Sequence, residues 1–266
     1  MDASARLTAL TRIGFAARGL VYVVIGMLLI RAGRPEGPSG ALQYLAEGGG
    51  ELFMMLISAG FGAYGLWRLA DALFNIERHP PDAKGLRERL GAGGSGVVHL
   101  LLAWQAVRLF RGDAAGGEDS TAEASDAALS LLGPDELTLP AAGAVLLAAG
   151  AFQLIKAAKC SYLRHLEPQI ASRDWAKWIG RLGYGARGIV FLISGYFLLK
   201  AGLQQPSGEA GGIEGALAWL DNPWDVLVAG GLIAFGLYSL VEARFRILHD
   251  VPVKEIADGS VRPTLH

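Results

Sequence analysis

Residues 12–21 read Arg-Ile-Gly-Phe-Ala-Ala-Arg-Gly-Leu-Val, and residues 181–190 read Arg-Leu-Gly-Tyr-Gly-Ala-Arg-Gly-Ile-Val. Between them, residues 89–98 form a weaker copy, Arg-Leu-Gly-Ala-Gly-Gly-Ser-Gly-Val-Val. Each copy opens an apolar stretch, and self-similarity of this kind indicates one structural unit that is repeated along the chain. The sequence therefore predicts three versions of one unit.

Six apolar segments accompany these copies, two in each unit, at residues 13–30, 52–74, 92–107, 137–155, 182–199 and 226–241. Their lengths cluster around the ~20 residues that a helix needs to cross a hydrocarbon core of ~30 Å. Only 18% of the residues are charged, so six buried soluble helices would lack the polar sequence to cover an exterior facing water. We therefore predict an all-α polytopic membrane protein with six transmembrane helices in a lipid bilayer. Nucleic acid is not an expected partner.

The three units match beyond the opening phrase. Their outer loops carry an Ala-Leu segment at residues 40–45, 127–132 and 215–220, each predicted to be a short helix on the outer surface. Their second spans share a glycine, at Gly62, Gly150 and Gly236. We predict two-helix repeats at residues 10–78, 87–165 and 178–246, followed by a cytoplasmic tail at 247–266. Because each repeat starts and ends on the same side, the repeats are parallel, and a pseudo-threefold arrangement is the expected packing.

Lysine and arginine in the short flanks predict the orientation, because the cytoplasmic side of a membrane protein carries the excess of positive charge. Most of these residues lie on the side of both termini, and the loops of the other side are acidic. That other side holds only Arg31, Arg34, Arg108, Arg111 and Lys200. We expect a multi-pass protein of the bacterial inner (plasma) membrane with both termini in the cytoplasm.

The G-x-x-A-R-G-x-V opening, the outer A-L-x-x-L segment and the G-x-Y-x-L second span together resemble a bacterial membrane family defined only as domain of unknown function 1206. The resemblance covers residues 10–246. The middle unit departs from the pattern, with Ser95 where the other units have Arg18 and Arg187. The resemblance implies membrane location and three repeats, and it implies no activity, substrate or cofactor.

Two arginines lie inside predicted spans. Arg18 and Arg187 follow the first arginine of their phrase by six residues, or ~9 Å at a helical rise of ~1.5 Å per residue. The second helices return to this depth with Asp71 and Glu242. One interpretation is a pair of structural ion pairs, Arg18 with Asp71 and Arg187 with Glu242, that fix the helix register. The other is a polar pathway for an ion, a proton or a small anion, because intramembrane charges mark such pathways.

The middle unit breaks this symmetry. It has Ser95 at the arginine position, His99 one turn later, and Lys156 aligned with Arg68 of the first unit. A lone histidine on an apolar helix is either a hydrogen-bonded interior residue or a proton shuttle. If the repeats enclose an axis, selectivity would arise in this unit.

Three histidines, His79, His165 and His249, follow the even-numbered spans, so a threefold packing could bring them to one metal ion. The alternative is three solvated residues at helix ends, and we predict no metal site and no cofactor. Because no nucleophile, base and acid have a recognisable catalytic spacing, we expect the protein not to be an enzyme.

Two hypotheses of function follow. The first is permeation or transport of a small ion or solute through a polar interior, and the second is a structural or accessory subunit that docks another membrane protein. The residues that would line the polar interior are Arg18, Asp71, Arg187, Glu242, Ser95, His99 and Lys156.

Overall fold

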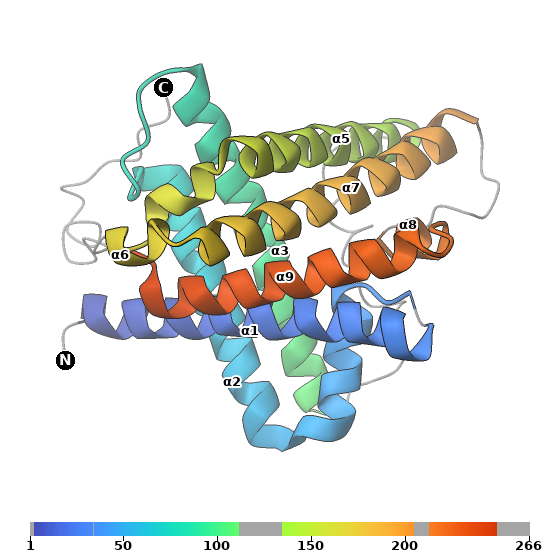
Figure 1. Cartoon of the computed structure of the whole chain (residues 1–266). Helices are drawn as coiled ribbons and strands as arrows, with labels where there is room; N and C mark the ends of the chain where they lie inside the picture. The colour runs from blue at the N-terminus through green and yellow to red at the C-terminus, as the bar shows by residue number, and fades with distance from the viewer. Residues whose placement is uncertain (1–2, 34, 112–134, 205–212, 249–266) are drawn as a thin grey trace. The chain divides into compact units, whose positions relative to one another are not determined.

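The computed structural model describes residues 3–33, 35–111, 135–204 and 213–248, and its elements in these ranges are helices (Figure 1). The all-α prediction is thus confirmed. The helices are α1 Ala3–Ala32, α2 Pro38–Phe74, α3 Ala83–Phe110, α5 Asp135–Lys159, η1 Ser161–His165, α6 Pro168–Ala171, α7 Asp174–Gln204, α8 Ile213–Ala218 and α9 Trp224–Phe245.

Within the residues that the structure describes, six helices are long and apolar enough to cross a membrane, in agreement with the predicted number of spans. These spans differ from the predicted apolar segments mainly in length. The third begins nine residues earlier than expected, at Ala83, because the Asp82 carboxylate caps α3 by accepting a hydrogen bond of 2.8 Å from the Gly85 amide. The candidate spans are Thr8–Arg31, Gly50–Phe74, Ala83–Phe110, Pro140–Lys159, Asp174–Leu203 and Trp224–Phe245.

The short helices predicted before the second spans are present in the first and third repeats. In the first, α2 is interrupted at Gly50, whose φ of 71° is accessible to glycine and separates a short helix from the span. In the third, α8 covers most of the predicted segment. The two helices bury the same dipeptide, at Ala41-Leu42 and at Ala216-Leu217. The segment predicted at residues 127–132 lies outside the described residues.

The chain forms two compact units that do not follow the repeat boundaries. Unit 1 consists of residues 1–18, 46–114 and 241–266, and unit 2 of residues 19–45 and 115–240. The helices α1, α2 and α9 therefore each contribute to both units. Each unit is described by itself below.

Close glycine contacts join the helices of unit 1. A Cβ atom on Gly96 of α3 would lie 3.0 Å from the Gly65 carbonyl oxygen of α2, and Gly14 of α1 is in still closer contact with Gly60 of α2. The core beside this second contact contains Phe15, Tyr64, Trp67 and Ile76. Small residues allow such close approach in a lipid environment, where helices gain nothing from leaving water.

Unit 2 uses equivalent glycines. Figure 1 shows α5 and α7 running side by side, and a Cβ atom on Gly188 of α7 would lie 3.1 Å from the Gly150 carbonyl oxygen of α5. In the same register, a Cβ atom on Gly19 of α1 would lie 2.7 Å from the Gly236 carbonyl oxygen of α9. In both helix pairs, therefore, the glycine after the second arginine of the repeated sequence (Gly19 or Gly188) contacts the shared glycine of a second span (Gly236 or Gly150).

The first arginine of each phrase has one common role, which is to bind the free carbonyl groups at the C-terminus of a second span. This interaction satisfies carbonyls that have no intrahelical partner and places positive charge at the negative end of the helix dipole. The bonds are Arg12 to Ala243 (2.9 Å) and Arg244 (2.7 Å), Arg89 to Ala72 (2.9 Å) and Leu73 (3.1 Å), and Arg181 to Ala157 and Ala158 (both 3.2 Å). The bonds of each arginine lie inside one unit. They join three pairs of helices: α1 with α9, α3 with α2, and α7 with α5.

Candidate functional site

Two buried charges of unit 1, on Arg18 and Glu242, meet directly. Nη2 of Arg18 donates a hydrogen bond of 2.5 Å to Oε2 of Glu242, and its Nη1 donates one of 2.9 Å to the Tyr64 hydroxyl. Arg18 is 7% exposed and Glu242 1%. Charges at this depth need such a partner, because an unpaired ion in a low-dielectric interior is strongly destabilising.

This arrangement corrects the predicted pairing. The carboxylate found against Arg18 is Glu242 of the third repeat, where Asp71 of its own repeat was predicted, because α9 contacts α1 in the glycine register described above. Glu242 was predicted to pair with Arg187, but both of its oxygens bind other arginines. Its second oxygen, Oε1, accepts a hydrogen bond of 2.6 Å from Nη1 of Arg246.

Arg246 extends the network toward the loop after α2. Its Nη2 lies 3.2 Å from Oε2 of Glu77, and the Glu77 amide donates a hydrogen bond of 2.7 Å to Oδ1 of Asp71. The guanidinium of Arg246 also lies 5.2 Å from the centre of the Phe15 ring. The arginine thereby holds two carboxylates, one from α9 and one from the loop.

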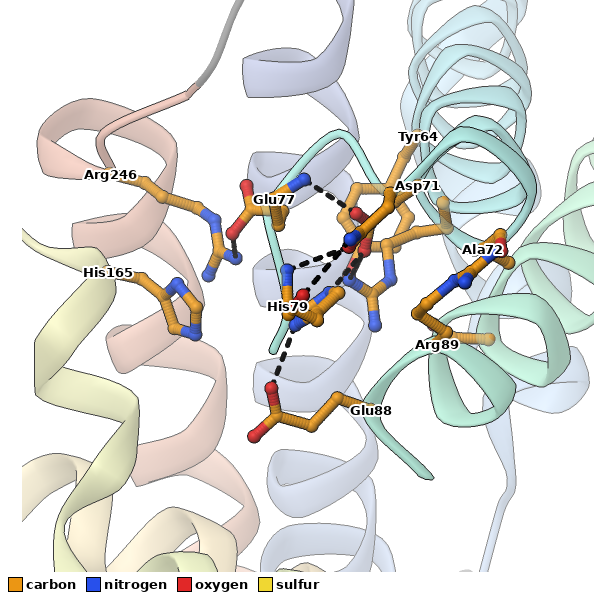
Figure 2. A network of polar contacts seen from close by, with 12 residues as sticks. Tyr64, Asp71, Ala72, Glu77, His79, Glu88, Arg89, His165 and Arg246 are labelled. Carbon is orange, nitrogen blue, oxygen red and sulfur yellow. Dashed lines mark hydrogen bonds and ion pairs between the residues drawn. The ribbon is translucent and has the colours of Figure 1, made fainter. Parts of the chain in front are cut away.

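Asp71 is completely buried, with 0% exposure, and has two further partners. Its Oδ2 lies 3.0 Å from Nε2 of His79 and 3.5 Å from Nη1 of Arg68. The other ring nitrogen of His79, Nδ1, lies 2.8 Å from Oε2 of Glu88 on α3. Figure 2 shows the imidazole between these two carboxylates, which come from different helices.

The loop after α2 holds His79 in this position. Asn75 adopts a left-handed conformation, with φ of 54°, which asparagine tolerates better than most residues. Its side chain accepts a hydrogen bond of 2.7 Å from the His79 amide and donates one of 3.0 Å to the His79 carbonyl. The backbone at His79 is thus fixed from the end of the helix that supplies Asp71.

The surroundings of His79 favour its protonated form. Burial by itself lowers the pKa of an imidazole, but the hydrogen bonds and negative charges of Asp71 and Glu88 outweigh burial and raise the pKa of His79 above its ordinary 6.5. A protonated imidazole donates from both nitrogens, which matches the two carboxylates that it faces.

One proton on His79 balances the charge of this network. Among the ion pairs described above, three guanidinium groups contact four carboxylates, so these groups sum to one net negative charge when His79 is neutral and to none when His79 is protonated. The guanidinium groups are Arg18, Arg68 and Arg246, and the carboxylates are Asp71, Glu77, Glu88 and Glu242.

This balance predicts the pH dependence of stability. Because the pKa of His79 is raised on folding, its contribution is fully present below pH 6.5 and is lost as the pH rises through the folded-state pKa. We expect the difference in thermal stability between the wild type and His79→Gln in detergent to shrink as the pH increases from about 5 to about 8. Titration of the His79 imidazole by nuclear magnetic resonance checks the sign directly. A midpoint at or below 6.5 would contradict it, and Glu88→Gln should lower the midpoint.

Two of the residues predicted from the middle repeat lie beside this network in unit 1. Nδ1 of His99 is 2.7 Å from the Ser95 carbonyl oxygen, and the imidazole packs 4.5 Å from the centre of the Tyr64 ring. Tyr64 in turn accepts the hydrogen bond from Arg18. The structure therefore brings Arg18 and His99 to one tyrosine, with Ser95 in contact with His99, and Asp71 is connected through the loop.

The remaining predicted residues, Arg187 and Lys156, belong to unit 2 and contact aromatic rings. The Arg187 guanidinium carbon lies 4.9 Å from the centre of the Phe235 ring, and Lys156 Nζ lies 4.6 Å from that of Phe152 and 5.9 Å from that of Tyr184. Such contacts stabilise a cation through the negative faces of the rings.

The three-histidine metal hypothesis finds no geometric support. In unit 1 His79 lies between carboxylates, in unit 2 His165 Nε2 accepts a hydrogen bond of 3.1 Å from its neighbour Arg164, and His249 lies outside the described residues. Within the ranges that the structure describes, no group of three or more His, Cys, Asp or Glu side chains is arranged to hold a metal ion.

Sequence reasoning missed four members of the network. Glu77, Glu88 and Arg246 were not considered as members of a network, and His79 was considered as a metal ligand or as a solvated residue at a helix end. A usable signal was present, because the buried Asp71 lies near the end of its span and residues 75–88 then place a histidine among three acids, Glu77, Asp82 and Glu88.

Comparison with known proteins agrees with the repeat architecture. The model of the family described as Domain of Unknown Function (DUF1206) matches residues 13–75, 90–159 and 182–246, one segment in each predicted repeat. The chain is 30% identical over 249 residues to the uncharacterized protein YxxB of Bacillus subtilis (strain 168), which covers 88% of this chain and 90% of the relative. No solved structure matches the chain. With three matched segments and a relative of nearly equal extent, the chain belongs to the DUF1206 family of multi-span membrane proteins of unknown function.

Proposed function

We propose that this protein moves a small ion across the membrane through its polar interior, and that the ion is the proton. The observation that supports the proposal is the contact of both His79 ring nitrogens with carboxylates, at 3.0 Å to Asp71 and 2.8 Å to Glu88. An imidazole can accept a proton at one nitrogen and release one from the other. Chains of Asp, Glu and His inside membranes are typical of proton relays.

The geometry favours a proton over a hydrated ion. Both oxygens of Asp71 and both oxygens of Glu242 are already engaged at 2.5–3.0 Å. A metal cation would have to displace these partners, because hard cations require several oxygen ligands of their own. A proton needs no empty binding site, because it can move along hydrogen bonds that are already present. The arginines stay charged and set the local potential without exchanging protons themselves.

The second candidate is a structural or accessory subunit that docks another membrane protein. It is favoured by the mutual neutralisation of Arg18, Glu242, Arg246 and Glu77, which is what a network that only fixes helix register requires. Copurification of a stoichiometric membrane partner, together with absence of flux, would favour this role. Both candidates are non-enzymatic, and the Lys and Arg of the flanks support an inner-membrane orientation with cytoplasmic termini.

Proton flux into reconstituted vesicles tests the first proposal. Purified protein is reconstituted into liposomes that contain a pH-sensitive dye, and a potassium gradient with valinomycin supplies the driving voltage. We expect acidification faster than in protein-free vesicles, a return to the protein-free rate for His79→Gln and Asp71→Asn, and a wild-type rate for the matched control His165→Gln.

Two results would overturn this function. The first is a wild-type rate equal to that of protein-free vesicles across the pH range of the His79 titration. The second is undiminished flux in His79→Gln. Circular dichroism and gel filtration of each variant in detergent would establish that the compared proteins are folded.

A further inference from the structure

The chain turns from α5 to α7 at one membrane surface. The candidate span of α5 ends at Lys159 and that of α7 begins at Asp174, so the connecting residues 160–173 lie between two span ends. All of them belong to unit 2. Trp175 and Trp178 of α7 are 45% and 54% exposed, and exposed tryptophans are enriched at the boundary between hydrocarbon and headgroups. This turn therefore lies at the level of the headgroups.

Hydrogen bonds hold the turn in one arrangement. Tyr162 of η1 is 2% exposed, and its hydroxyl donates a hydrogen bond of 2.5 Å to the Lys177 carbonyl oxygen of α7. Its ring stacks on that of Tyr184, with 5.0 Å between the ring centres. The Tyr238 hydroxyl of α9 donates a hydrogen bond of 3.1 Å to the Tyr162 carbonyl oxygen. These contacts fix η1 against the first turns of α7.

The charge of this turn is mostly positive. Residues 159–181 contain five lysines and arginines and two acids, which gives a net charge of +3. The cations are Lys159, Arg164, Arg173, Lys177 and Arg181, and the acids are Glu167 and Asp174. Clusters of lysine and arginine beside the end of a span attract the headgroups of anionic lipids.

Arg181 lies at the centre of the positive cluster. Its Nη2 donates hydrogen bonds of 3.2 Å to the Ala158 carbonyl oxygen and to Sγ of Cys160, which are the neighbours of Lys159 in the chain. The backbone of Lys159 thus lies beside the guanidinium, and its exposed side chain has a flexible stem. The centre of the Trp178 ring is 5.3 Å from the guanidinium carbon. Two cations and one interfacial ring therefore meet at the end of α5.

Comparison with the other repeats shows that helix capping does not explain this cluster. Arg12 and Arg89 bind the ends of α9 and α2 through the same kind of contact. The residue after the two bound carbonyl groups is Lys159 in α5 and phenylalanine in α9 and in α2. Four residues before the arginine, α7 has Lys177, whereas α1 has threonine and α3 has glycine. Capping needs the arginine alone, so the two lysines point to another role.

Exposed apolar side chains lie one turn inside the cations. Ile155 of α5 precedes Lys159 by four residues and is 51% exposed. Leu182 of α7 follows Trp178 by four residues and is 57% exposed. Residues four apart lie on the same side of a helix, so acyl chains can pack along both side chains below a phosphate at the cluster.

We propose that Lys159, Lys177, Trp178 and Arg181 form a binding site for the headgroup of an anionic phospholipid. Among the described residues, Nη1 of Arg181 has no hydrogen-bond acceptor and the side chains of both lysines make no hydrogen bond or ion pair, so these groups are available to a phosphate. The excess of positive charge favours an anionic headgroup over a zwitterionic one. The site uses no residue of the proton network and goes beyond the proposed function.

Native mass spectrometry of the purified full-length protein tests the site. The protein is delipidated in a neutral detergent and titrated with phosphatidylglycerol or with phosphatidylcholine of the same acyl chains. We expect phosphatidylglycerol to bind at least about fivefold more tightly, which is the contribution of one cation near an anionic headgroup. Lys159→Gln should weaken phosphatidylglycerol binding about fivefold, and Lys159→Gln combined with Lys177→Gln about 25-fold if the two contacts add.

The lysines are changed because Arg181 also caps α5, whereas neither lysine side chain has a structural contact among the described residues. Lys200→Gln is the matched control, since it makes the same substitution at an exposed lysine near the other end of α7 and should bind as the wild type does. Equal binding of the two lipids by the wild type, or wild-type affinity of the double variant for phosphatidylglycerol, would overturn the proposal. Neither result bears on proton flux, so the two proposals fail separately.

Discussion

Replacing Glu242 by glutamine is expected to lower the free energy of unfolding by about 3–5 kcal/mol, the range found when one partner of a buried ion pair is removed. The carboxylate serves two guanidinium groups, Arg18 at 2.5 Å and Arg246 at 2.6 Å, and is 1% exposed. Glutamine keeps the shape and removes the charge, so two buried cations lose their shared counter-ion. Denaturant-dependent loss of helicity in detergent micelles measures the effect.

Two comparisons identify the charge as the cause. Glu51→Gln makes the same substitution at an exposed residue at the start of a span, and it should change stability by less than about 0.5 kcal/mol. Arg18→Gln combined with Glu242→Gln should be less destabilised than the sum of the single variants, because the second change removes a charge that the first left unpaired. A loss below about 1 kcal/mol for Glu242→Gln would mean that water, not protein, neutralises these arginines.

A second large effect is expected from Gly183→Leu in α7. A Cβ atom on Gly183 would lie 2.5 Å from Cα and 2.6 Å from N of Phe235, so the added side chain meets the backbone of α9, which cannot yield locally. Overpacking of this kind costs about 3 kcal/mol or more when helices must separate. Thermal unfolding and gel filtration in detergent should show a strongly destabilised or aggregated protein.

Gly185 is the matched control two residues later on the same helix. A Cβ atom there would have nothing within 4 Å. Leucine at either position gains about 0.8–1.0 kcal/mol of helix propensity over glycine, so Gly185→Leu should be neutral or slightly stabilising. Equal stabilities of Gly183→Leu and Gly185→Leu would show that α7 and α9 do not approach each other through Gly183.

The repeats and the six spans were predictable because both depend on local sequence. A span needs only length and apolarity, and the phrase at residues 12–21 marks its own copies. Helix starts were less predictable. The polar stretch before Ala92 gave no sign of a span, since the start of α3 is fixed by the cap at Asp82.

The charge network shows where reading the sequence fails. The position of Arg18, Asp71 and Glu242 along their helices predicts their depth in the membrane. It does not predict which of these side chains form ion pairs with each other. The choice of partner depends on which helices are in contact, and in the three helix pairs joined by the first arginines a first helix contacts the second helix of another repeat. Pairing within a repeat was the simpler assumption, and it was wrong for Arg18. The ion pairs of His79 were not predicted, because its two carboxylates come from different helices.

The bond from Arg12 to the end of α9 links residues 231 positions apart. During synthesis Arg12 leaves the ribosome 231 residues before Ala243 of α9. The nascent protein must therefore keep α1 available until α9 has been made. A truncated product that stops before α9 leaves Arg12 without these carbonyl groups, so quality-control proteases would encounter an unfinished edge on every such chain.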